Sequence, residues 1–130
     1  MNKKYLISGL IVIGFLALYL AGCGPKIEKF GEAPDETQVK TAIATLLVNP
    51  QNYQDKEVVV EGVISSECPT GGWIRVNENS GASIYVEMHG SSFAPIPQRV
   101  GKKVLVKGTV YQSEGSDKEI KLLGKGLVIR

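Results

Sequence analysis

The sequence predicts a mainly β protein: a five-stranded Greek-key barrel preceded by one short α-helix, after an apolar signal helix that is cleaved off. Two observations predict the barrel and its helix. After residue 56, β-branched residues recur with a period of two in short runs that Gly- and Asn-containing turns separate. Before residue 56, one stretch has the three-and-four apolar spacing of a helix. The chain has 130 residues, which leaves room for one domain after the signal.

Residues 1–22 have the features of an export signal. Lys3 and Lys4 precede an uncharged run from Tyr5 to Gly22, which is the order of a basic region and an apolar region in a signal peptide. The run is close to the length of a membrane-spanning helix, since about 20 apolar residues cross a bilayer. An uncleaved signal anchor is therefore the alternative, and the end of the run decides between the two.

The run ends in Leu20-Ala21-Gly22-Cys23, which resembles the lipobox of bacterial lipoproteins. The resemblance implies that a signal peptidase recognises Leu20, Ala21 and Gly22, cleaves before Cys23, and leaves lipid on the Cys23 thiol. It also implies a domain outside the cytoplasm, anchored in the cell membrane or the outer membrane. Two or more acyl chains make such an anchor stable, because each buried CH₂ contributes roughly 0.8 kcal/mol. Membrane lipid is thus the first expected partner.

Residues 23–34 are polar and contain Gly and Pro at several positions. This composition is typical of a flexible connection. We expect this segment to be a tether between the lipidated cysteine and a domain that covers residues 35–130.

A helix is predicted from Asp35 to Val48. Asp35 and Gln38 have the spacing of a capping box, in which two side chains bond the free backbone N–H groups of a helix start, and Asn49-Pro50 ends the pattern. The apolar residues of one helical face are expected in the core: Val39, Ala42, Ile43, Leu46 and Leu47.

Five strands are expected after the helix. Their ranges are Glu57–Ser65, Trp73–Asn77, Ser83–Met88, Lys103–Tyr111, and a last strand from near Glu119 to Val128. Gly62 and Gly108 interrupt the first and fourth strands, where a glycine often marks a bulge or a bend. Asn79-Ser80-Gly81 suits a tight hairpin turn. The segment Gly90–Gly101 is expected to be a long connection, because its prolines exclude a regular helix.

This pattern of strands matches a small Greek-key OB barrel. The segments Tyr53–Gly62 and Val100–Gly108 resemble the first and fourth strands of OB domains in the anticodon-binding-like superfamily. Cys68-Pro69-Thr70-Gly71-Gly72-Trp73 resembles a segment of uncharacterised bacterial exported OB-fold proteins. The resemblance implies a binding module in the cell envelope. The long connection departs from OB folds that carry a helix there, so we expect the helix at 35–48 to plug the barrel instead.

The second and third predicted strands form the usual ligand face of an OB fold. Alternation along these strands directs five side chains outward, Asn77 among them. The other four are the candidate ligand face: Trp73, Arg75, Tyr85 and Glu87. Two aromatic rings beside an arginine can stack on a sugar, a base or a partner's side chain. The alternative is that Trp73 and Tyr85 only cover the barrel. The expected ligand is a protein or a saccharide of the cell envelope.

The charge balance argues against nucleic acid as the main ligand. Lys3 and Lys4 account for the formal net charge of +2, so residues 23–130 carry equal numbers of basic and acidic residues, without the basic excess of a nucleic-acid binder. Single-stranded nucleic-acid binding is an alternative that rests on fold analogy. Five lysines lie on or beside the last two strands: Lys103, Lys107, Lys118, Lys121 and Lys125. We expect Glu57 and Glu61 on the neighbouring first strand to pair with two of them, Lys103 and Lys107.

Cys68 is the only thiol once Cys23 is lipidated, so no intrachain disulfide is expected. A metal or redox role of Cys68 with Met88 and His89 is a further alternative, although no Cys-x-x-Cys motif is present. A single histidine excludes a two-histidine zinc motif, and neither a G-x-S-x-G motif nor a P-loop occurs. We therefore expect no catalysis, no bound metal and no cofactor.

Overall fold

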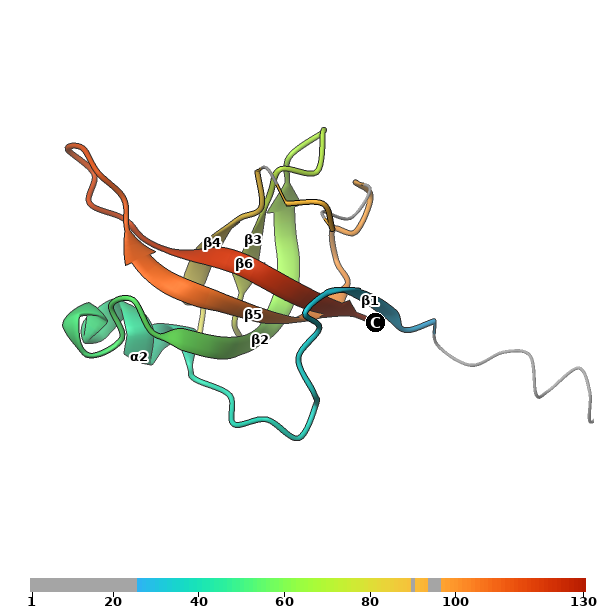
Figure 1. The fold of residues 1–130 in the computed structure, drawn as a ribbon, viewed down its shortest axis with the longest axis horizontal. Coiled ribbons are helices and arrows are strands. Elements are labelled where there is room, and N and C mark those ends of the chain that lie inside the picture. Colours follow the sequence, from blue (N-terminus) through green and yellow to red (C-terminus); the bar gives the residue numbers. More distant parts are fainter. Residues whose placement is uncertain (1–25, 90, 94–96) are drawn as a thin grey trace, which may run out of the picture.

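The computed structural model describes residues 26–89, 91–93 and 97–130. The predicted signal peptide, the lipobox and Cys23 lie outside these residues. The elements in chain order are β1 (Glu28–Gly31), α2 (Ile43–Val48), a short 3-10 turn η1 (Pro50–Asn52), β2 (Glu57–Glu67), β3 (Trp73–Asn77), β4 (Ser83–Glu87), β5 (Lys103–Gln112) and β6 (Ile120–Ile129) (Figure 1). Within the described ranges, neither helix has the length and apolar character needed to cross a bilayer.

Five strands close into a barrel. Strand β3 pairs with β2 and β4, and β5 pairs with β2 and β6, all antiparallel. The pairing of β4 with β6 is parallel and closes the ring. The predicted mainly β barrel of five strands is therefore confirmed. Strands β2 to β5 also begin at the residues predicted from the sequence, because alternation of apolar and polar residues marks a strand locally.

The core fills the inside of this barrel with side chains from every strand. Ile74 and Val76 of β3 and Ile84 and Val86 of β4 are all buried in it. Their burial leaves the alternate residues of β3 and β4 on the outer surface, as predicted. The core therefore sets the direction of the side chains that form the candidate ligand face.

The helix is shorter than predicted. One of the two capping contacts expected at its start forms, since the N–H of Asp35 donates to Oε1 of Gln38 at 2.9 Å. The carboxylate of Asp35 accepts instead from the N–H of Thr37 at 2.9 Å. These bonds stabilise a turn rather than a helix. Further along, the N–H of Thr41 donates to the carbonyl of Val59 at 2.8 Å. This bond holds the backbone extended beside β2, so α2 begins only at Ile43.

Only two of the five predicted core residues of the helix are in the core. Ile43 and Leu46 are fully buried and belong to the barrel cluster, so a short helix does plug the barrel. The prediction is wrong for Ala42, Leu47 and Val39, which are exposed, Val39 by 89%. The cause is the short helix, because two turns cannot present the long apolar stripe that the sequence spacing implied.

The start of α2 is capped from a distant part of the chain. Carboxylate oxygens of Glu78, in the β3–β4 turn, accept hydrogen bonds from the N–H groups of Ile43 at 2.7 Å and Ala44 at 3.3 Å. Burial opposes ionisation of Glu78, but these bonds and one from Ser80 outweigh it and lower its pKa. A charged cap therefore ties the helix to the barrel.

The expectation of a flexible tether over residues 23–34 is wrong for Glu28–Gly31. These residues form β1, which pairs antiparallel with the end of β6, Glu28 opposite Ile129 and Gly31 opposite Gly126. Strand β1 was not predicted, because its four residues show no distinctive alternation of apolar and polar side chains. These residues form a strand only through their pairing with β6. The chain from Cys23 to the first paired residue is correspondingly shorter.

Residues 32–41, here called the strap, bond the barrel backbone near both ends, where Glu32 donates to Lys125 and Thr41 donates to Val59. Between these ends the strap arcs away from the strands (Figure 1). Val59, Leu105 and Val128 come from three neighbouring strands and form a second buried cluster on the outer side, against which Ala33 packs. The strap therefore covers apolar residues that the barrel itself leaves on its surface.

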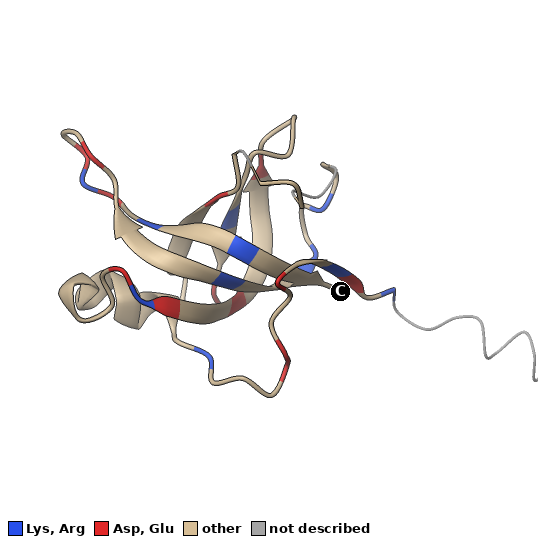
Figure 2. Ribbon diagram, viewed as in Figure 1, with Lys and Arg blue, Asp and Glu red and all other residues tan. Residues whose placement is uncertain are grey.

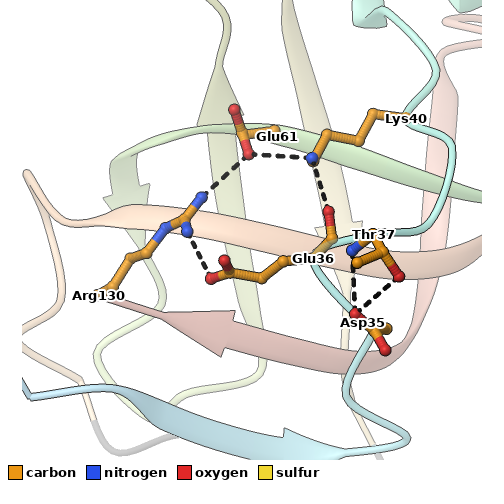
Figure 3. Close-up of polar contacts among 6 residues, drawn as sticks. All are labelled: Asp35, Glu36, Thr37, Lys40, Glu61 and Arg130. Atoms are coloured by element: carbon orange, nitrogen blue, oxygen red, sulfur yellow. Dashed lines mark hydrogen bonds and ion pairs between the residues drawn. The ribbon is translucent and has the colours of Figure 1, made fainter.

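Charged side chains hold the strap in place (Figure 3). The guanidinium of Arg130 bonds the carboxylates of Glu36 and, at 3.1 Å, Glu61. The ammonium of Lys40 lies 3.9 Å from Glu61 and donates to the backbone carbonyl of Glu36. Because these groups are exposed, each pair contributes only about 0 to 1 kcal/mol, but together they fix where the strap lies.

The predicted cross-strand ion pairs are confirmed in one case. Nζ of Lys107 lies 3.5 Å from the carboxylate of Glu57. The prediction for Glu61 and Lys103 is wrong, because Lys103 lies opposite Val63 in the β2–β5 register. Glu61 instead pairs with the strap network described above.

Candidate functional site

The four predicted surface residues come together on the outer side of β3 and β4. Arg75 lies opposite Tyr85, and Trp73 lies opposite Glu87. All four side chains are partly exposed. The parallel pairing of β4 with β6 adds Lys121, directly opposite Tyr85. We call these five residues the aromatic face.

The rings of the aromatic face are stacked on each other. The ring centroids of Trp73 and Tyr85 are 5.4 Å apart, with 28° between their planes. Nζ of Lys121 lies 4.5 Å from the centroid of Tyr85, and Cζ of Arg75 lies 5.8 Å from it. Stacking and cation–π attraction fix these side chains before any ligand arrives. A ligand that binds here loses less free energy to side-chain ordering than it would on mobile residues.

Charges of both signs surround the rings. NH2 of Arg75 and an Oε1 of Glu119 are 3.1 Å apart, and the hydroxyl of Tyr85 donates to Oε2 of Glu87 at 3.2 Å. Burial raises the pKa of Tyr85 to about 12, and the negative charge of Glu87 adds to the shift. Tyr85 is therefore a neutral hydrogen-bond donor at any physiological pH.

Glu87 links the aromatic face to His89. It accepts hydrogen bonds from the backbone N–H of His89 at 2.9 Å and from Nδ1 of the same residue. Burial opposes ionisation of Glu87, but the bonds from His89 outweigh it and lower the pKa of Glu87. The carboxylate is therefore charged and oriented, as a hydrogen-bond acceptor for a ligand should be.

The loop between β2 and β3 places Cys68 beside this face. Sγ of Cys68 is 3.1 Å from Oγ1 of Thr70. The Thr70 hydroxyl, then the N–H groups of Thr70 and Gly72, lower the pKa of Cys68 from 9.0 to about 7. The His89 ring lies over Gly72, where a Cβ would come within 2.2 Å of Nε2. Only glycine allows this approach, which brings His89 to the cysteine loop.

Met88, which the metal alternative grouped with Cys68 and His89, is 1% exposed and belongs to the barrel core. Across the part of the chain that the structure describes, no three His, Cys, Asp or Glu side chains are grouped so as to hold a metal ion. The feature of Cys68 that the structure does show is a thiol with a lowered pKa.

The lowered pKa of Cys68 predicts its alkylation profile. Because the thiolate is the nucleophile, the iodoacetamide reaction rate should rise with pH and reach half of its plateau near pH 7, rather than near pH 9. Thr70→Val removes the largest cause of the shift and should move this midpoint upward. Mass spectrometry of the Cys68 peptide measures the alkylation rate of the wild type and of Thr70→Val at each pH. If the rates of the two proteins have the same midpoint pH, the Thr70 hydroxyl does not cause the lowered pKa of Cys68.

A cavity of about 950 Å³ lies away from the aromatic face, between the strap, β2 and the start of β5. Its charged lining includes Glu36, Glu61 and Arg130, which pair with one another. The cavity therefore offers few free polar groups, and the aromatic face remains the better candidate for ligand binding.

Neither a protein-family model nor a curated protein matches the sequence. Solved structures do match. OBody AM3L09 bound to hen egg-white lysozyme is 20% identical with a TM-score of 0.54, over 72% of this chain and 96% of that chain. OBody AM2EP06, also bound to hen egg-white lysozyme, is 24% identical with a TM-score of 0.51, over 74% and 94%. A putative aspartyl-tRNA synthetase from Leishmania major Friedlin is 18% identical with a TM-score of 0.54.

The fold is an OB-fold. This agrees with the closed barrel and with the sequence resemblance to anticodon-binding-like OB domains. The alignment with the synthetase covers 80% of this chain but only 22% of the synthetase. These identities show a shared fold alone. The function of this OB barrel therefore has to be argued from its own residues.

Proposed function

We propose that this protein is a lipid-anchored OB-fold binding protein of the bacterial cell envelope that binds a protein or a saccharide through its aromatic face. The observation that carries the proposal is the stacked pair of Trp73 and Tyr85 with Arg75 and Lys121 at its edges. Rigid aromatic side chains with adjacent hydrogen-bonding groups are typical of surfaces that bind sugars and protein side chains.

The charges around the rings favour a protein or saccharide over single-stranded nucleic acid. Glu119 lies 3.1 Å from Arg75 and 3.9 Å from Lys121, so both cations of the face have a carboxylate beside them. Glu87 adds a further negative charge. A phosphate backbone would meet these carboxylates at close range. The two OBody structures are bound to lysozyme, which supports a protein as one class of ligand for an OB barrel.

The anchor part of the proposal is supported by the lipobox resemblance of Leu20-Ala21-Gly22-Cys23. The mass of the native chain tests it directly. The expected mass lacks residues 1–22 and includes acyl chains at Cys23. A mass that retains the signal, or an unmodified Cys23, would contradict the anchor.

The binding part predicts that the aromatic face controls partner capture. Native lipidated protein is crosslinked in envelope membranes, and its partners are quantified by mass spectrometry. Trp73→Ala and Tyr85→Ala should each reduce capture at least tenfold, since truncation of an aromatic hot spot costs about 2 kcal/mol or more. Val39→Ala, an exposed apolar residue of the strap, is the matched control and should leave capture unchanged.

Two further results would decide between ligand classes. Titration with soluble cell-wall glycan fragments should change the fluorescence of Trp73 if the ligand is a saccharide, and should leave it unchanged if the ligand is a protein. Titration with single-stranded oligonucleotides at low salt should leave it unchanged in either case. A salt-dependent signal with oligonucleotides, or equal capture by Trp73→Ala and the wild type, would contradict the proposal.

A further inference from the structure

We propose that the end of the barrel where β1 begins docks on anionic phospholipid headgroups, so that the domain rests on the membrane in one orientation. The proposal rests on the lipid anchor of the proposed function. It concerns a surface of five residues, here called the anchor end: Lys26, Ile27, Val100, Lys102 and Lys103.

The short distance along the chain brings this end to the membrane. Only residues 24–27 separate Cys23 from Glu28, the first residue of β1. A fully extended chain covers at most about 3.6 Å per residue, so the Cα atoms of Cys23 and Glu28 are within about 18 Å of each other. Lipid on Cys23 therefore keeps the start of β1 close to the headgroups.

Strand β1 is joined to the barrel, so an anchor that holds the start of β1 near the membrane also holds the barrel there. Glu28 pairs with Ile129 in the β1–β6 ladder, and Ile129 pairs with Val104 of β5. Nε and NH2 of Arg99 also donate to the carboxylate of Glu28, at 2.7 and 3.0 Å. The ladder and this bidentate pair leave the anchor end as the part of the domain nearest the membrane.

Positively charged side chains surround Glu28 at this end. The bond from Arg99 is the largest cause of the lowered pKa of Glu28, and the charges of Lys26 and Lys102 add to it. Three cations thus surround one carboxylate. Figure 2 shows Lys and Arg on the segment that leads into β1 and on the connection that enters β5.

The carboxylates near this end are already bound by other groups. Glu67 accepts backbone N–H groups of Gln98 and Arg99. Glu36 and Glu61, which line the same cavity as Lys103, bind the guanidinium of Arg130. Lys102 and Lys103 are exposed and take part in no ion pair among the described residues. The anchor end therefore presents free ammonium groups, which anionic headgroups attract by about 1 kcal/mol for each lysine close to the surface.

Exposed apolar side chains lie among these lysines. Ile27 is 54% exposed and Val100 is 55% exposed. Ile27 lines the same cavity as Lys103. Apolar side chains surrounded by basic residues suit the boundary between headgroups and acyl chains. There the apolar side chains insert and the basic side chains bind phosphate. This composition favours a lipid surface over a protein partner at the anchor end.

The anchor end and the aromatic face are different surfaces, because they share no residue. Along β6, Lys121 of the aromatic face lies eight residues before Ile129, which is about 26 Å at the rise of a strand. Trp73 lies nearer to the anchor end, since its neighbour Ile74 pairs with Glu67. The two proposed contacts therefore use different side chains of one molecule.

The test measures lysine acylation on native lipidated protein in vesicles. The vesicles contain phosphatidylcholine alone or with about one third phosphatidylglycerol, and mass spectrometry follows each lysine. Lys102 and Lys103 should react roughly fivefold more slowly on the anionic vesicles. Lys56 and Lys118, exposed and near the other end of β5, should change less than about twofold. Salt at about 0.5 M should remove the difference, because the Debye length falls to about 4 Å.

A pair of variants with equal charge change completes the test. The double variant Lys102→Glu, Lys103→Glu should abolish the protection of Lys26 on anionic vesicles, whereas Lys56→Glu, Lys118→Glu should retain it. If the wild-type protein carries lipid on Cys23 but shows no protection of Lys102 and Lys103, docking is overturned and the anchor stands. If the mass shows an unmodified Cys23, the anchor and the docking fail together.

Discussion

Replacing Leu46 by alanine is expected to lower the free energy of unfolding by about 3 kcal/mol, as deletion of a buried leucine side chain usually does. Leu46 is fully buried in the barrel cluster, where α2 inserts it. The neighbouring Leu47 is 39% exposed. Leu47→Ala removes the same atoms from the next position and should lower the free energy of unfolding by less than about 1 kcal/mol.

Urea denaturation of the two variants measures this difference. Because both substitutions change helix propensity equally, their difference reports burial in the barrel alone. Equal losses of stability would mean that α2 does not plug the barrel in solution. The aromatic stack of Trp73 and Tyr85 should persist in both variants, because it lies on the outer side of β3 and β4 whereas Leu46 is buried inside the barrel.

Replacing Gly126 by alanine should detach the strap and lower the free energy of unfolding by roughly 2 kcal/mol. A Cβ at this position would lie 2.1 Å from the carbonyl oxygen of Glu32 and 2.6 Å from the nitrogen of Ala33. These are backbone atoms, so the strap has to move as a whole. Its movement would expose the outer cluster around Leu105, which adds to the loss.

Gly124→Ala is the matched control on the same strand. Its Cβ would meet side-chain atoms of Met88 and Val86 at 3.1 Å, which can shift by a few tenths of an ångström, so the change in stability should stay below about 1 kcal/mol. Limited trypsin digestion at Lys40 reports strap release. Unchanged stability together with unchanged cleavage in Gly126→Ala would show that the strap does not lie on β6.

In the proposed lipid-anchored protein, β1 and the strap determine how freely the barrel moves relative to Cys23. A tether running to residue 34 would let the domain rotate freely about the proposed anchor. Pairing of Glu28–Gly31 with β6 removes most of that freedom. Strand β6 runs from Lys121 of the aromatic face to Ile129, which pairs with Glu28 beside the anchor end.

The barrel strands and the outward residues of β3 and β4 were predictable from the sequence. Alternation is a local property, and Ile74, Val76, Ile84 and Val86 place Trp73 and Tyr85 on the opposite side whatever the rest of the chain does. The stacking of the two rings follows from the β3–β4 register, which the short hairpin turn sets. Lys121 could not be predicted, because it reaches Tyr85 only through the parallel β4–β6 pairing.

The bounds of the helix and of the tether could not be predicted from the sequence. The capping contact of Asp35 with Gln38 forms as its spacing implies, yet the helix begins eight residues later. Hydrogen bonds from Thr41 to Val59 and from Ile43 to Glu78 decide where it starts. Alternation of apolar and polar residues is therefore sufficient to locate the barrel strands, each of which pairs with a neighbour on both sides. Short segments such as β1 and α2 have too few internal hydrogen bonds to define themselves, so contacts with distant residues determine their structure.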